Sequence, residues 1–138
     1  MRAQVIFGLI LAVPVAVLLY LLFGPALRRW RRRKLRAVAP PAGLEATLTR
    51  NVPLYPAMPA ELRRQLLGHV NVFLAEKNFI GCGGQEINDE IRYTVAGTAC
   101  ILLLNREPEY FPGFTSILVY PDTFASVNVQ YDGPVEVH

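Results

Sequence analysis

The sequence predicts an α+β fold, in which an N-terminal transmembrane helix is followed by a small, incomplete cytoplasmic domain of helices and strands. Three observations predict this class: an uncharged apolar segment near the start, a central stretch with helical periodicity, and a short apolar run near residue 116 that is typical of a strand. The expected parts are a membrane anchor at 1–27, a basic juxtamembrane segment and linker at 28–50, and a soluble domain at 51–138.

The apolar segment VIFGLILAVPVAVLLYLLFG, residues 5–24, has no charge, and the uncharged stretch continues to Leu27. This length is enough to cross a hydrocarbon core of about 30 Å. Pro14 lies mid-span, where we expect a kink that a membrane helix tolerates. A cleaved signal peptide is the alternative, but its charges would precede the apolar run. Here only Arg2 precedes it, so the positive-inside rule places the N-terminus outside and the C-terminal part in the cytoplasm.

A basic run follows the anchor and is the only strongly positive part of the chain. Its eight candidate membrane-surface residues are Arg28, Arg29, Trp30, Arg31, Arg32, Arg33, Lys34 and Arg36. Beside a membrane span, such residues favour anionic lipid headgroups as a partner; the alternative is a general topology signal without a specific lipid. From residue 37 onward, six basic and 11 acidic residues give a net charge of −5, which argues against binding to nucleic acid.

Residues 37–46 have the Pro, Gly and Ala composition of a stiff linker, and the prolines of residues 51–59 predict an extended segment. Residues 60–77 predict a helix, since Leu62, Leu66, Val70, Phe73 and Leu74 share one face. A second helix is expected from an N-cap at residue 88 or 89 to about residue 105, although its β-branched residues leave a strand possible. Residues 116–121 predict a strand, and residues 124–138 a ragged hairpin.

The stretch FIGCGGQE, residues 79–86, is interpreted as a structural turn whose glycines adopt positive φ. It lacks the Lys and Ser or Thr of a Walker A loop, and neither a preceding strand nor the third glycine of a dinucleotide fingerprint is found. Cys82 and Cys100 do not have CxxC spacing and are expected to be free thiols. His69, at the middle of the first soluble helix, is expected at a boundary or on the surface rather than at a metal.

Three blocks together resemble the N-terminal half of the Mlc titration factor A family of zinc-dependent peptidases: NVPLYPAMPAELRRQL, FLAEKNFIGCGGQEINDEIRYTVAGTACILLLN and YFPGFTSILVYPDTF. The resemblance covers about residues 51–124. It implies a zinc peptidase, whose HExxH helix holds the metal and activates water. That motif is absent from these 138 residues, so we assign no catalytic or metal-binding residue, and we expect these residues alone to bind no zinc and to be inactive.

The resemblance also suggests a role for the predicted strand at 116–121. Peptidases of this kind often align an extended substrate along an edge strand, here Ile117, Leu118, Val119 and Tyr120. A buried core strand is the alternative. Two further alternatives concern the whole chain: a non-catalytic, membrane-tethered module that binds a cytoplasmic regulatory protein or peptide, or an anchored fragment that does not fold alone. We also expect an exposed apolar face, where the rest of the family's domain would pack.

Overall fold

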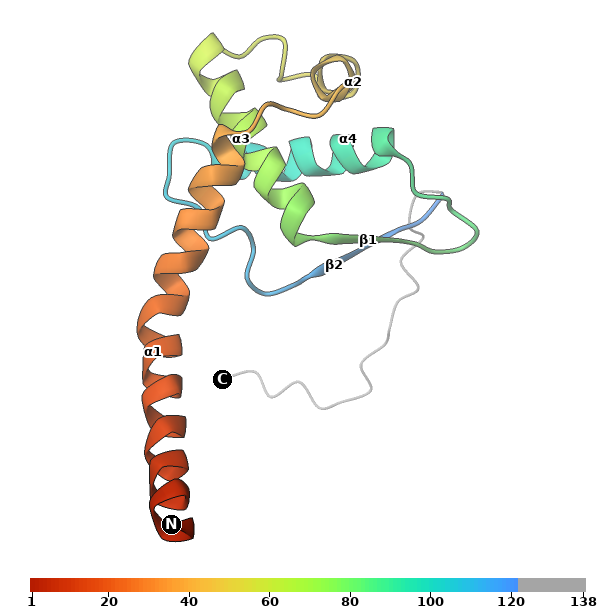
Figure 1. Cartoon of the computed structure of the whole chain (residues 1–138). Helices are drawn as coiled ribbons and strands as arrows, with labels where there is room; N and C mark the ends of the chain where they lie inside the picture. The colour runs from red at the N-terminus through yellow and green to blue at the C-terminus, as the bar shows by residue number, and fades with distance from the viewer. Residues whose placement is uncertain (122–138) are drawn as a thin grey trace, which may run out of the picture.

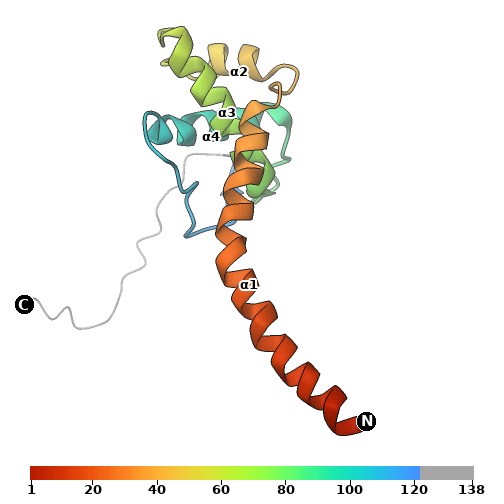
Figure 2. The ribbon, with the colours of Figure 1, turned by 60° about the vertical axis from the view of Figure 1, so that its left-hand side comes forward.

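The computed structural model describes residues 1–121. Its longest element is α1 (Arg2–Ala37), which continues through Pro14 and Pro25 as one helix and is about 54 Å long at 1.5 Å per residue. Figures 1 and 2 show its first half projecting away from the other elements, and no residue of α1 is fully buried. Within the described residues, α1 is the one helix that is long and apolar enough to cross a membrane.

The expected linker is shorter than predicted, because α2 (Leu44–Asn51) begins inside it. Leu44 and Leu48, one helical turn apart, are fully buried, and this burial stabilises a helix of only eight residues. The expectation of an extended segment at 51–59 is wrong. Residues 53–57 form consecutive turns, in which Tyr55 N–H donates to Val52 O at 2.9 Å and Met58 N–H donates to Tyr55 O at 3.1 Å.

The two predicted helices of the soluble part are present as α3 (Ala60–Glu76) and α4 (Asp89–Cys100). Asn88 caps α4, since its side chain accepts a hydrogen bond from Ile91 N–H at 2.9 Å, and the first turn carries Asp89 and Glu90. The α-helix ends earlier than expected, and a short 3-10 helix, η1 (Ile101–Leu103), follows it.

A two-stranded sheet joins β1 (Asn78–Gly81) to β2 (Ser116–Val119). The strands are parallel, with Asn78 opposite Ser116 and Gly81 opposite Val119, and α4 lies in the crossover between them. Sequence reasoning placed β2 correctly but missed β1, so the statement that no strand precedes the glycine-rich loop is wrong. The hairpin expected at 124–138 lies outside the described residues. Helices with one small sheet fit the predicted α+β class.

The core lies among α2, α3, α4, η1 and the sheet. Its buried hydrophobic residues are Leu44, Leu48, Val52, Tyr55, Leu66, Val70, Val72, Phe73, Tyr93, Ala96, Cys100, Leu103 and Tyr110. A small residue on α4, Gly97, allows a close approach of α2. A Cβ at Gly97 would lie 2.2 Å from Cδ2 of Leu48, so this buried side chain would have to shift to admit any other residue where α2 packs on α4.

Candidate functional site

The basic end of α1 is a docked helix rather than a free segment, because it packs along α3. The guanidinium of Arg32 donates two hydrogen bonds to the Glu76 carboxylate, at 2.8 and 2.9 Å. The Asn71 side chain donates to the main-chain oxygens of Leu35 and Val38, at 3.3 and 2.8 Å. This bidentate ion pair and the helix C-terminal contacts attach the end of the apolar helix directly to the soluble part.

A buried polar pair lies beneath this junction. Arg32 stacks over the Tyr110 ring at 4.9 Å from its centre, and the Tyr110 hydroxyl is 2.7 Å from Nδ1 of His69. Burial raises the pKa of Tyr110 to about 12, and burial together with nearby Arg36 lowers the pKa of His69 below its usual value. The expectation that His69 lies at a boundary or on the surface is therefore wrong. It is 4% exposed, because Tyr110 supplies the hydrogen bond that a buried imidazole needs.

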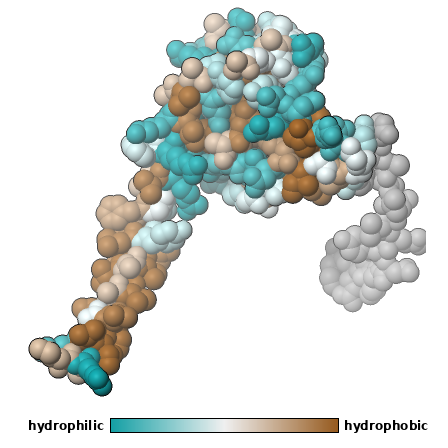
Figure 3. All heavy atoms as spheres, turned by 45° about the vertical axis from the view of Figure 1, so that its right-hand side comes forward, coloured by the Kyte–Doolittle hydropathy of each residue, from teal (hydrophilic) through white to brown (hydrophobic). Residues whose placement is uncertain are grey.

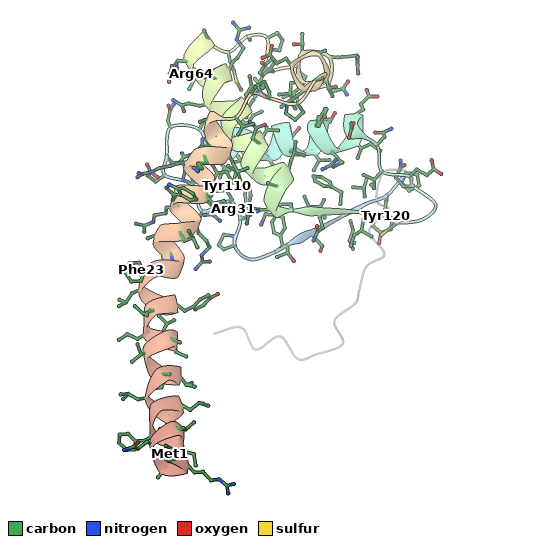
Figure 4. All side chains as sticks on the ribbon, viewed as in Figure 1. Met1, Phe23, Arg31, Arg64, Tyr110 and Tyr120 are labelled. Atoms are coloured by element: carbon green, nitrogen blue, oxygen red, sulfur yellow. The ribbon has the colours of Figure 1, made fainter. Side chains whose placement is uncertain are left out.

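The basic run divides into two groups according to how exposed each residue is. Arg32 and Arg36 are half-buried against the soluble part. The exposed group comprises Arg28, Arg29, Trp30, Arg31, Arg33 and Lys34, in which the Lys34 ammonium lies 3.9 Å from the centre of the Trp30 ring. In Figure 4, Arg31 lies beside the soluble part and Phe23 lies on the projecting half of the same helix.

A pocket of about 490 Å³ separates this end of α1 from the segment before Tyr110. Five arginines line it, Arg28, Arg29, Arg32, Arg33 and Arg36, together with Glu107, Glu109 and three other residues. The lining therefore carries a net positive charge, which suits an anion more than a cation. Five positive charges against two carboxylates make it more basic than the pocket beside His69, which has three arginines against two glutamates.

The candidate substrate-aligning strand is β2, which is half-exposed. Ile117 packs against the core, whereas Leu118 is 56% exposed and Tyr120 is 46% exposed. Asn78 N–H donates to Thr115 O and Cys82 N–H donates to Val119 O, so the main-chain groups of residues 115, 117 and 119 face β1. Ser116 and Leu118 direct theirs to the opposite edge, where the described part of the chain has no further strand.

The family of the chain follows from comparison with known proteins. The sequence profile of the family described as glucose-regulated metallo-peptidase M90 matches residues 27–138, which is most of the chain. The chain belongs to this metallopeptidase family. The match confirms the resemblance to the Mlc titration factor A peptidases, and it begins 24 residues before the stretch that carried the resemblance.

One relative of the chain is a Synechocystis sp. protein described only as uncharacterized. It is 31% identical over 117 residues, covering 85% of this chain and 42% of the relative. The chain therefore spans about two fifths of the length of the curated relative that it matches. No solved structure matches the chain.

A metallopeptidase of this family implies a metal ion, and the described residues do not provide a site for one. Within residues 1–121, no three His, Cys, Asp or Glu side chains come together as a metal ion requires. Nδ1 of His69 is already bonded to Tyr110, and Cys100 is buried, which raises the pKa of its thiol to about 12. Both cysteines are free thiols, as predicted.

The glycine-rich loop of the chain is a turn, as the sequence predicted. Gly83 and Gly84 have φ angles of 61° and 82°, a region that favours glycine. A Cβ at Gly81 would lie 1.8 Å from the main-chain oxygen of Gln85, so the chain could not return so closely with any other residue there. The loop connects β1 to the cap of α4, and Glu86 still stands where a dinucleotide fingerprint needs glycine.

Proposed function

We propose that this chain is the membrane-anchored N-terminal part of a zinc-dependent peptidase that hydrolyses peptide bonds with metal-activated water. The observation that carries the proposal is the position of the family match, which begins at Leu27, directly after the apolar half of α1. The anchor and the peptidase region are thus continuous in one helix. The metal and the catalytic glutamate would come from parts of the protein outside residues 1–121.

The charge distribution supports an orientation with the N-terminus outside and the soluble part in the cytoplasm, as a single-pass membrane protein. Seven basic residues follow the apolar half of α1, and one precedes it. The exposed basic group would contact anionic lipid headgroups at the cytoplasmic surface. The arginine-lined pocket beside Glu109 is a further place for such a headgroup.

The outer edge of β2 supports a role in binding extended peptide. A substrate that added a strand there would bond to the main chain of Ser116 and Leu118, as in β-strand addition. In the complete enzyme, Ser116→Pro would remove one outward donor at an edge position that tolerates proline. Peptide cleavage should fall while Ser116→Ala retains it. Equal cleavage by both variants, with unchanged circular dichroism, would remove this role from β2.

The experiment that tests the proposed activity begins with reading the source gene past codon 138. The complete protein is then purified in detergent, its zinc is measured by mass spectrometry, and cleavage of an unstructured peptide is followed. The proposal expects an HExxH motif, about one zinc per chain, and loss of cleavage when the motif's glutamate becomes glutamine. A complete protein with no such motif and no bound zinc would contradict it.

The exposed edge of β2 also favours the second function, a non-catalytic tethered module that binds a cytoplasmic protein or peptide. The two functions are distinguished by the fate of the bound polypeptide. A binding module in lipid nanodiscs would retain an intact peptide whether or not zinc is present. A peptidase would release two fragments, and a chelator would stop the cleavage.

A further inference from the structure

The junction between α1 and α3 fixes which side of the soluble part is nearest the membrane. Gly68 lies against Arg36, and further along α3 Glu76 bonds to Arg32. α3 therefore runs antiparallel to α1, toward the apolar half. β1 begins two residues after Glu76, at Asn78, so the sheet starts on the membrane side of the soluble part. Arg32 lies about 8 Å along the helix from Leu27, the last residue of the uncharged stretch.

The figures agree with this arrangement. In Figure 1, β1 and β2 form the side of the soluble part toward which the apolar half of α1 runs, while α2 and α4 lie on the other side. In Figure 4, Tyr120 lies level with Arg31 and well above Phe23 along α1. Measured along α1, the sheet therefore lies close to the point where the apolar half of the helix ends and the basic run begins.

One face of this sheet is apolar and exposed. Phe79 and Ile117 pack against the core, so their neighbours Ile80 and Leu118, which are opposite each other in the register, face away from it. Ile80 is 46% exposed and Leu118 is 56% exposed. Figure 3 shows apolar surface at the lower edge of the soluble part as well as along the projecting helix.

Aromatic residues continue this surface beside the sheet. Phe114 is 43% exposed and stacks on Phe111 at 5.7 Å between ring centres. Lys77, at the membrane side of α3, donates to the main-chain oxygens of Phe111 and Phe114, which holds this loop next to the start of β1. Tyrosine and other aromatic rings are typical of the boundary between headgroups and acyl chains.

The charge pattern identifies the occupant of this face. The soluble part has a net charge of −5, yet the two segments that build the face, residues 78–85 and 110–121, have no charged residue. A carboxylate there would be repelled by anionic headgroups, and none is present. We propose that this charge-free face, formed by Ile80, Phe114, Leu118 and Tyr120, rests on the membrane interface of the leaflet in which α1 ends.

This inference depends on the proposed anchoring by α1, and the test separates the two. Trp30→Phe removes the one tryptophan of the full chain, and single tryptophans are then introduced one at a time. Each variant is placed in vesicles whose phospholipids are brominated near the carbonyl end of the acyl chain. Leu118→Trp probes the face. Leu102→Trp is the matched control, because Leu102 is an exposed leucine on η1. The main chain soon after η1, at Asn105, is bonded to Gln65, which lies on the half of α3 that is farther from the proposed membrane. Phe23→Trp probes the anchor.

The proposal expects the tryptophan at 118 to lose most of its emission to the bromines, as at 23, while the tryptophan at 102 loses little. Quenching at 23 but not at 118 would overturn the inference and leave the anchor intact; the face would then be covered by another part of the protein or by a partner. The absence of quenching at 23 would overturn the anchor and the inference together. Unchanged circular dichroism shows that each variant retains the fold.

Discussion

The two halves of α1 are parts of one helix with different surroundings. The first half exposes large apolar side chains along its whole length, including Val5, Leu18 and Phe23, and projects away from the rest of the described chain. The second half is strongly basic, yet it is the half that packs against protein, where Arg32 and Leu35 meet α3. The comparison teaches that the apolar half of this helix has no protein packed over it among the described residues, whereas its charged half contacts protein on one side.

The largest effect is expected from charges in the first half. Leu18→Arg with Leu19→Arg places two charges near mid-span, each costing about 3 kcal/mol at the centre of a membrane helix. The chain should lose its resistance to extraction by alkaline carbonate. The same two changes at exposed positions of the soluble part, such as Leu54→Arg with Leu102→Arg, should leave the extraction unchanged. If the chain substituted at both mid-span leucines still resisted carbonate, the role of this half would be contradicted.

A smaller effect is expected where the second half contacts α3. Glu76→Ala leaves half-buried Arg32 without its two hydrogen bonds and should lower the free energy of unfolding by about 1–2 kcal/mol. Glu61→Ala is the matched control. It removes an exposed ion pair with Arg64 and should cost much less than Glu76→Ala, because water screens that pair. Urea unfolding of the full chain in mild detergent measures both; equal losses would show that the junction is no tighter than a surface contact.

The smallest effect concerns the buried pair beneath the junction. Because the pKa of His69 is lowered in the folded state, the unfolded chain binds the proton more readily. The free energy of unfolding should therefore decrease as the pH falls below about 6.5, the usual histidine pKa, and stay constant above it. The His69→Gln variant should lose most of this slope between about pH 7 and 5. An unchanged slope would assign the pH dependence to other groups.

Local signals in the sequence were enough to predict several elements. The uncharged stretch predicted the apolar half of α1, the helical period predicted α3, and the Asn88 cap with Asp89 and Glu90 predicted the start of α4. These elements are determined by residues within a turn or two of one another. The Gly97 contact was also predictable, since a small-residue patch on a helix marks a close approach.

The missed features depend on residues far apart in the chain. β1 has four residues and is a strand only because it pairs with β2, about 38 positions later. His69 is buried because Tyr110, 41 positions away, satisfies its ring nitrogen. α2 did carry a short signal, since Leu44 and Leu48 are one turn apart and Glu45 lies in its first turn. Because this signal spans only eight residues and follows a proline-rich segment, the linker-like composition dominated the prediction.

The docking of the basic run was also missed, and here a signal existed. A run of arginines is most often solvated on all sides, so its members were treated alike. Leu35 is the one aliphatic residue longer than alanine in the basic run of residues 28–37; Arg32 lies three residues before it, and Arg36, one helical turn after Arg32, follows it directly. These three residues form the stripe that faces α3, so helical periodicity within a charged run can reveal a packed face.

The most direct test of the central claim is a disulfide across the junction in the membrane-bound chain. A Cβ at Gly68 would lie 3.4 Å from Cβ of Arg36, close to disulfide geometry. The full chain carries Arg36→Cys and Gly68→Cys, with Cys82→Ser and Cys100→Ala. A control carries Arg33→Cys, at an exposed residue of α1, in place of the change at 36.

Membranes are washed with carbonate and oxidised, and the polypeptide is then cleaved between the two cysteines. On a non-reducing gel, a disulfide keeps the two fragments together. The account predicts that the 36–68 pair crosslinks within the washed membranes and that the 33–68 pair does not. The central claim is that one helix both crosses the membrane and holds the soluble part against its own basic end. That claim would be contradicted if the chain stayed in the membrane but neither pair of cysteines formed a disulfide, or if both pairs did so equally.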